Sequence, residues 1–111
     1  MPKSSDIKLT VQLDDQNVPE KILWNAEGKQ DVECKAMLLS LFDKNHLDTY
    51  KIDLWTKEMH VMEMDRFMYQ SLRALAETYF KATHNSELAN AFQSFVEYFG
   101  ENTEVIPKTN D

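Results

Sequence analysis

The fold class of this chain depends on one stretch, Cys34-Lys35-Ala36-Met37-Leu38-Leu39-Ser40-Leu41-Phe42. Its alanine, methionine and leucine residues favour a helix by intrinsic propensity. The polar cluster Asp43-Lys44-Asn45-His46 follows at once, however, and the next run, Tyr50-Lys51-Ile52-Asp53-Leu54-Trp55, alternates apolar and polar residues as a strand does. We therefore predict that the stretch is a strand paired with that run. Its apolar residues fall on both faces, which is typical of a central strand.

The residues before this stretch indicate an earlier hairpin. The run Ile7-Lys8-Leu9-Thr10-Val11-Gln12-Leu13 alternates strictly. The cluster Asp14-Asp15-Gln16-Asn17 favours a turn, because short polar side chains bond to their own backbone. A second run then places Ile22, Trp24 and Ala26 on one face. Polar residues 27–31 separate this predicted hairpin from the next one.

The apolar period changes after Trp55 and predicts two helices. From about Val61 to Thr83, large apolar residues recur at intervals of three and four: Met64, Phe67, Met68, Leu72, Leu75, Tyr79 and Phe80. The segment His84-Asn85-Ser86 interrupts the pattern with good N-cap residues. A second apolar stripe follows and is expected to end at Gly100: Leu88, Ala91, Phe92, Phe95, Val96 and Phe99.

Strands grouped before helices predict an α+β fold. We expect a four-stranded antiparallel β-sheet made of two consecutive hairpins, followed by two α-helices packed on one face. Residues 1–6 form an N-terminal extension, residues 7–100 a single α+β domain, and residues 101–111 a polar C-terminal tail.

The composition narrows the range of partners. The chain has 111 residues, with 12 basic against 19 acidic side chains and a formal charge of −7. This charge repels phosphate backbones and anionic lipids, so we expect no nucleic acid partner. No apolar run is long enough for membrane insertion or for a signal peptide. A single cysteine, Cys34, fits a reducing compartment, and we expect a cytoplasmic protein.

No residue pattern indicates catalysis or metal binding. His46, His60, His84 and Cys34 are scattered and lack zinc-site spacing. Residues 43–54 begin like a calcium loop, but the sixth position lacks the required glycine and the twelfth the required glutamate. With two glycines the chain cannot build a glycine-rich phosphate loop. We therefore expect no catalytic residue, metal ligand or cofactor, and a hairpin loop at residues 43–48.

Several strings resemble the gliding motility-associated protein GldC family over about residues 7–99. They are Ile7-Lys8-Leu9-Thr10-Val11-Gln12-Leu13-Asp14, Val18-Pro19-Glu20-Lys21-Ile22 with Trp24, Lys35-Ala36-Met37-Leu38-Leu39-Ser40, Ile52-Asp53-Leu54-Trp55-Thr56-Lys57-Glu58-Met59, Met64-Asp65-Arg66-Phe67 and Phe95-Val96-Glu97-Tyr98-Phe99. The resemblance implies a cytoplasmic accessory protein of the gliding machinery of Bacteroidetes-type bacteria. It implies no reaction and no active site.

An open sheet leaves its second face without helices, and we expect that face to bind protein. The predicted interaction surface comprises Leu23, Met37, Leu39, Leu41 and Trp55. Trp55 is the expected anchor, since tryptophan is enriched at interface hot spots, unless a loop or the tail covers it. The partner is a protein of the gliding machinery or a second copy in a homo-oligomer. The alternative is a small-ligand carrier, or an undetected enzyme, with a pocket of roughly 300 Å³ or more between sheet and helices.

Overall fold

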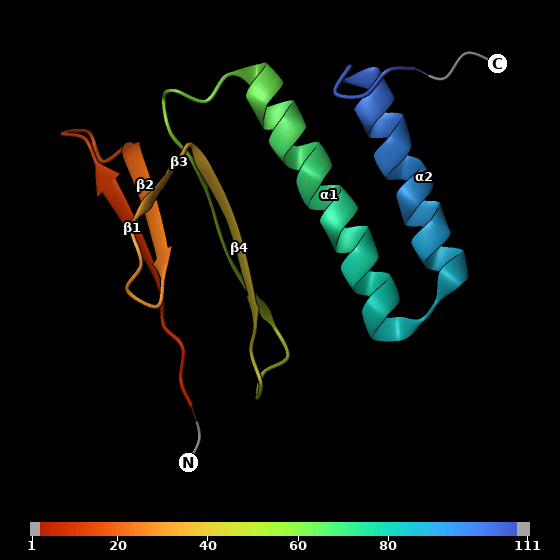
Figure 1. Ribbon diagram of the computed structural model, residues 1–111, viewed down its shortest axis with the longest axis horizontal. Coiled ribbons are helices and arrows are strands. Elements are labelled where there is room, and N and C mark those ends of the chain that lie inside the picture. The colour runs from red at the N-terminus through yellow and green to blue at the C-terminus, as the bar shows by residue number, and fades with distance from the viewer. Residues whose placement is uncertain (1–2, 109–111) are drawn as a thin grey trace. The chain divides into compact units, whose positions relative to one another are not determined.

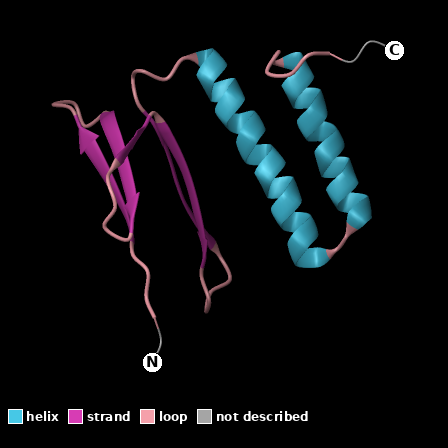
Figure 2. Cartoon of the chain, viewed as in Figure 1, coloured by secondary structure: helices cyan, strands magenta, loops and turns pink. Residues whose placement is uncertain are grey.

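A computed structural model describes residues 3–108 of the chain. The chain forms two compact units. One extends up to Met59 and contains the strands, and the other begins at His60 and contains the helices (Figure 1). Figure 2 colours strands and helices separately. The elements are β1 (Ile7–Leu13), β2 (Pro19–Ala26), β3 (Val32–Cys34), β4 (Ala36–Phe42), β5 (Thr49–Trp55), α1 (Val61–Thr83) and α2 (Ser86–Asn102). The predicted α+β class, with antiparallel strands before two helices, is confirmed.

The first predicted hairpin forms as expected. β1 and β2 pair antiparallel from Ile7 opposite Ala26 onward. The carboxylate of Asp14 holds the turn between them, because its Oδ1 accepts hydrogen bonds from the backbone N–H groups of Gln16 at 2.8 Å and Val18 at 3.0 Å. A second neighbour, β3, pairs with the other edge of β2.

The predicted four-stranded sheet is wrong, because the strands form one sheet of three, β1-β2-β3, and one of two, β4-β5. Only the three residues of β3 stay beside β2, and the chain then bends at Lys35 (Figure 1). Thr56 holds this bend: its N–H and its hydroxyl both donate to the carbonyl of Lys35, at 2.8 and 3.2 Å. Thr56 is only 3% exposed, so these bonds are shielded from water. The bend takes β4 out of register with β2.

Most of the stretch on which the fold class depends is a strand, as expected, but the strand begins at Ala36, because Cys34 ends β3 and the chain bends at Lys35. β4 pairs antiparallel with β5 from Ala36 opposite Trp55 to Phe42 opposite Thr49. The prediction of a second hairpin is therefore confirmed, with residues 43–48 as its loop.

The first helix has the bounds that the sequence predicts. At its N-terminus the side chain of Glu63 accepts a hydrogen bond from the backbone N–H of His60 at 3.0 Å. At its C-terminus His84 adopts a left-handed conformation with φ 57°, and its N–H donates to the carbonyl of Phe80 at 2.8 Å.

The second helix begins as expected but ends later. Asn85 caps it, since its side chain accepts from the N–H of Leu88 at 3.1 Å. The expected end at Gly100 is wrong, because the helix continues to Asn102 and Gly100 is buried within it. A Cβ atom there would lie 2.6 Å from the ring of Tyr69 and 2.9 Å from Ile106. Glycine is thus required for close packing of side chains against the helix.

Part of the segment expected to be a polar tail folds back on α2. The backbone N–H of Ile106 donates to the carbonyl of Gly100 at 3.1 Å. Residues 109–111 lie outside the described residues. The single domain over residues 7–100, and the placement of both helices on one sheet face, stay predictions.

Candidate functional site

The β4–β5 hairpin has one face made entirely of apolar side chains. Strand alternation and the β4–β5 register place six residues on it, Met37, Leu39 and Leu41 opposite Leu54, Ile52 and Tyr50. We call these six residues the apolar face. Leu41, Tyr50 and Ile52 are at least half exposed. Three of the five residues predicted to bind a partner therefore lie together here.

The opposite face of the hairpin mixes apolar and charged side chains. Its residues are Ala36, Leu38, Ser40 and Phe42 from β4 and Thr49, Lys51, Asp53 and Trp55 from β5. We call these eight residues the mixed face. Trp55 lies here and is 60% exposed. The exposed Leu38 is its diagonal neighbour on β4, whereas the exposed Phe42 lies at the other end of the strand pair. Trp55 thus faces away from Met37, Leu39 and Leu41, although the sequence places all four on one surface.

The fifth predicted residue, Leu23, lies in the other sheet. It is half-buried in β2, opposite Thr10 of β1 and Glu33 of β3. The bend at Lys35 separates the sheet of Leu23 from the sheet of Trp55. The structure therefore distributes the predicted interaction surface over the two faces of β4–β5 and a second sheet.

The neighbours of Trp55 are not apparent from the sequence. An open pocket of about 290 Å³ lies at this end of β5, lined by Trp55, Leu54, Asp53, Val18 and Pro19. Val18 and Pro19 belong to the end of the β1–β2 turn, far away in the chain. Local periodicity carries no signal for such a contact, because it depends on how the two sheets fold over the bend.

An ion pair ties the β1–β2 turn to the segment after β5. The ammonium group of Lys57 pairs with the carboxylate of Asp14. This hydrogen bond, helped by the N–H groups of Val18 and Gln16, lowers the pKa of Asp14 from 3.8 to about 2. The same contact raises the pKa of Lys57. Both groups are charged at neutral pH, and they join the β1–β2 turn to the residues that follow β5.

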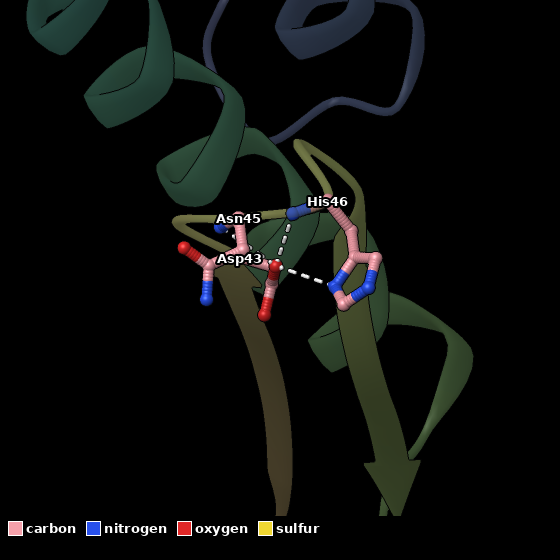
Figure 3. A network of polar contacts seen from close by, with 3 residues as sticks. All are labelled: Asp43, Asn45 and His46. Atoms are coloured by element: carbon pink, nitrogen blue, oxygen red, sulfur yellow. Dashed lines mark hydrogen bonds and ion pairs between the residues drawn. The ribbon is translucent and has the colours of Figure 1, made fainter.

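The loop between β4 and β5 is organised by Asp43 (Figure 3). Its carboxylate accepts hydrogen bonds from the N–H of His46 and, at 2.9 Å, of Asn45, and it lies 3.0 Å from Nδ1 of His46. The hydrogen bond from the His46 backbone is the main reason why the pKa of Asp43 is lowered. Asp43 therefore serves the loop itself, which confirms a hairpin loop at these residues.

The histidines and the cysteine lie at separate points of the two units. His60 precedes α1, His84 ends it, His46 is in the β4–β5 loop, and Cys34 ends β3. Within residues 3–108, no three His, Cys, Asp or Glu side chains are grouped so that they could hold a metal ion. In the same part of the chain, neither helix combines the length and the apolar character that crossing a membrane requires.

The helical unit carries a groove of its own. An open groove of about 360 Å³ lies between α1 and α2 near their connection. Most of the surface that lines this groove is apolar. The lining residues are Ala76, Glu77, Phe80, Lys81, Ser86, Ala89, Asn90 and Gln93. Phe80 also contacts the ring of His84 edge to face, with ring centroids 5.8 Å apart.

Comparison with known proteins identifies one family. The model of the family described as gliding motility-associated protein GldC-like matches residues 19–105. This match runs from the start of β2 through the end of α2 and leaves β1 outside, whereas the resemblance seen in the sequence begins at Ile7 and ends at Phe99. No curated protein and no solved structure matches the chain.

Proposed function

Because the chain belongs to the family of gliding motility-associated GldC-like proteins, we propose that it is a non-enzymatic accessory protein of the gliding machinery. It acts in the cytoplasm by binding another protein through the β4–β5 hairpin. The observation that carries this proposal is the exposure of Trp55 on the mixed face, next to the exposed Leu38.

The energetics of Trp55 favour a protein partner. A tryptophan left largely in water gains about 2 kcal/mol when a partner covers it. Tryptophan is a common interface anchor, and Asp53 and Lys51 follow Trp55 along the same face of β5 as charged neighbours. The charge of −7 supports a protein partner over a nucleic acid.

The test replaces Trp55 by glutamate in the full chain. Tagged wild-type protein and the Trp55→Glu variant are each produced in a gliding bacterium that lacks its own copy, and captured proteins and colony spreading are compared. We expect the variant to lose the captured gliding protein and to restore spreading poorly, because a charge replaces the anchor.

The matched control is Trp24→Glu, which makes the same change in the other sheet, where Trp24 of β2 is also exposed. Circular dichroism verifies that both variants are folded. Unchanged capture and unchanged spreading with folded Trp55→Glu would refute the proposed role of this surface.

A second candidate function is binding of a small ligand, and the groove between α1 and α2 favours it. Its volume is within the range of small-ligand sites, at roughly 300 to 1,000 Å³. Native mass spectrometry of the full chain purified from a gliding bacterium would detect a bound small molecule. The variant Asn90→Trp, which fills the groove from an exposed position, should remove it. A wild-type mass equal to that of the bare chain would count against this function.

A further inference from the structure

β5 has an unpaired backbone edge. Within residues 3–108, β5 hydrogen-bonds to β4 alone. Its sequence, Thr49-Tyr50-Lys51-Ile52-Asp53-Leu54-Trp55, is short and has no proline. An edge of this kind can pair with another strand unless charges, proline or a bulge prevent it.

The hydrogen bonds at the two ends of the hairpin determine which backbone groups point outward. The N–H of Asp43 donates to the carbonyl of Asp48, and the N–H of Thr56 donates to the carbonyl of Lys35, both at 2.8 Å. Bonded and non-bonded pairs alternate along an antiparallel ladder. The residues of β5 that bond to β4 are therefore Tyr50, Ile52 and Leu54. Those whose N–H and C=O groups point to the free edge are Thr49, Lys51, Asp53 and Trp55.

The charges on this edge complement each other when the strand meets its own copy. A second β5 that runs antiparallel, related by a two-fold axis at Ile52, places Lys51 of each copy opposite Asp53 of the other. Both residues belong to the outward-pointing set, so each such pair can exchange two backbone hydrogen bonds. Opposite charges on directly opposed residues stabilise a strand pair.

Other registers lack this pairing of Lys51 with Asp53. An axis at Lys51 places two lysines opposite each other, and an axis at Asp53 places two aspartates opposite each other. A shift by one residue pairs outward-pointing with inward-pointing backbone groups and turns the side chains to the wrong face. The register about Ile52 is thus singled out by both backbone and charge.

The other exposed strands do not share this property. β4 carries no charged side chain, and within β1 the single charged residue Lys8 has no opposite charge to meet. In β5, Lys51 and Asp53 lie on the same face with Nζ and Oδ1 3.2 Å apart, and both side chains are at least 40% exposed. Both are therefore accessible to a second copy.

We propose that two copies of this chain associate through antiparallel pairing of their β5 strands about Ile52, which joins the two β4–β5 hairpins into a four-stranded sheet. In this dimer Tyr50 faces Leu54 of the second copy, so the apolar face continues across the two-fold axis. The interface is isologous, as in most homodimers. The proposal rests on the proposed function and deepens it, because it names a second copy as one protein that the hairpin binds.

The test is a charge-reversal cycle followed by sedimentation equilibrium of the full chain. The single variants Lys51→Glu and Asp53→Lys each place like charges opposite each other twice. We expect each to weaken dimerisation at least about tenfold, since two favourable cross-strand pairs become unfavourable. An equimolar mixture of the two single variants should dimerise as the wild type does, because every Lys or Glu then meets its opposite.

The mixture distinguishes the proposed Lys51–Asp53 contact between copies from the Lys51–Asp53 ion pair within one strand. The double variant Lys51→Glu/Asp53→Lys restores both kinds of pair, but the mixture restores only the pair between copies. Lys44→Glu, which makes the same charge change in the exposed loop, is the control and should dimerise normally. The proposal is overturned if the wild type is monomeric, if either single variant dimerises as the wild type does, or if the mixture of the two single variants does not dimerise.

Amide hydrogen exchange gives a second readout at the backbone. Exchange at Lys51 and Asp53 should slow as protein concentration rises, while Ile52 is protected at all concentrations by β4. Exchange at Lys51 and Asp53 that is independent of concentration would contradict the pairing. The proposed function is tested separately by Trp55→Glu. Unchanged capture by that variant refutes the proposed function, whereas a monomeric wild type refutes the β5 pairing.

Discussion

The two hairpins of the strand unit have similar local sequences but different surroundings. β2 lies between β1 and β3, and its Ile22 is only 1% exposed. In β4 and β5 no residue is fully buried, and Ile52 is 50% exposed. The alternation of apolar residues is enough to form each hairpin, but only the first hairpin gains a third strand, and among the five strands only its middle strand, β2, has a fully buried residue. The second hairpin therefore keeps exposed apolar surface and an edge that pairs with no further strand within residues 3–108.

The largest expected effect comes from truncating one isoleucine in each hairpin. Ile22→Ala should lower the free energy of unfolding by about 3 kcal/mol, because it removes a fully buried side chain. Ile52→Ala should cost less than about 1 kcal/mol, since the side chain is already half in water. Urea unfolding at a protein concentration that keeps the chain monomeric measures both. Equal losses would show that the hairpins contribute equally to the core.

An intermediate effect is expected at the bend that separates the hairpins. Thr56→Val keeps the side-chain shape but removes the hydroxyl that donates to the carbonyl of Lys35. The free energy of unfolding should fall by about 1 kcal/mol, the usual contribution of one hydrogen bond. Thr49→Val, at an exposed position of β5, is the control and should change little. A Thr56→Val variant as stable as the wild type would mean that the backbone bond alone holds the bend.

The smallest effect concerns the link between the hairpins, and it depends on pH. The pKa of Asp14 is lowered from 3.8 to about 2, so folding is favoured by its ionised form. This contribution is fully present above about pH 4 and is lost as the pH falls towards about 2. In Asp14→Asn the urea midpoint should therefore fall less steeply over this window than in the wild type. High salt should reduce the difference, because the Lys57 side of the pair is exposed to solvent. Parallel pH profiles would contradict the role of Asp14.

Individual residues show which features of the fold the sequence predicts and which it does not. Asn85 and the apolar spacing along α1 predict the helices correctly, since caps and periodicity are local properties. Gly100 has the appearance of a helix stop, yet its role depends on the ring of Tyr69, a neighbour distant in the chain. Trp55 and Met37 are predicted to share a surface, but the register of β4 against β5 places them on opposite faces. Contacts between segments that are distant in the chain decide the role of Gly100 and the face on which Trp55 lies.

The sequence by itself determined the α+β class, the two hairpins, both helices and the family, because alternation, capping and turn residues act over a few neighbouring positions. The tertiary structure alone decided that the strands divide into two sheets and that Trp55 faces away from the apolar face. The reason is the bend at Lys35, whose carbonyl is bonded by the buried Thr56: this contact joins residues far apart in the chain, so local sequence patterns do not encode it.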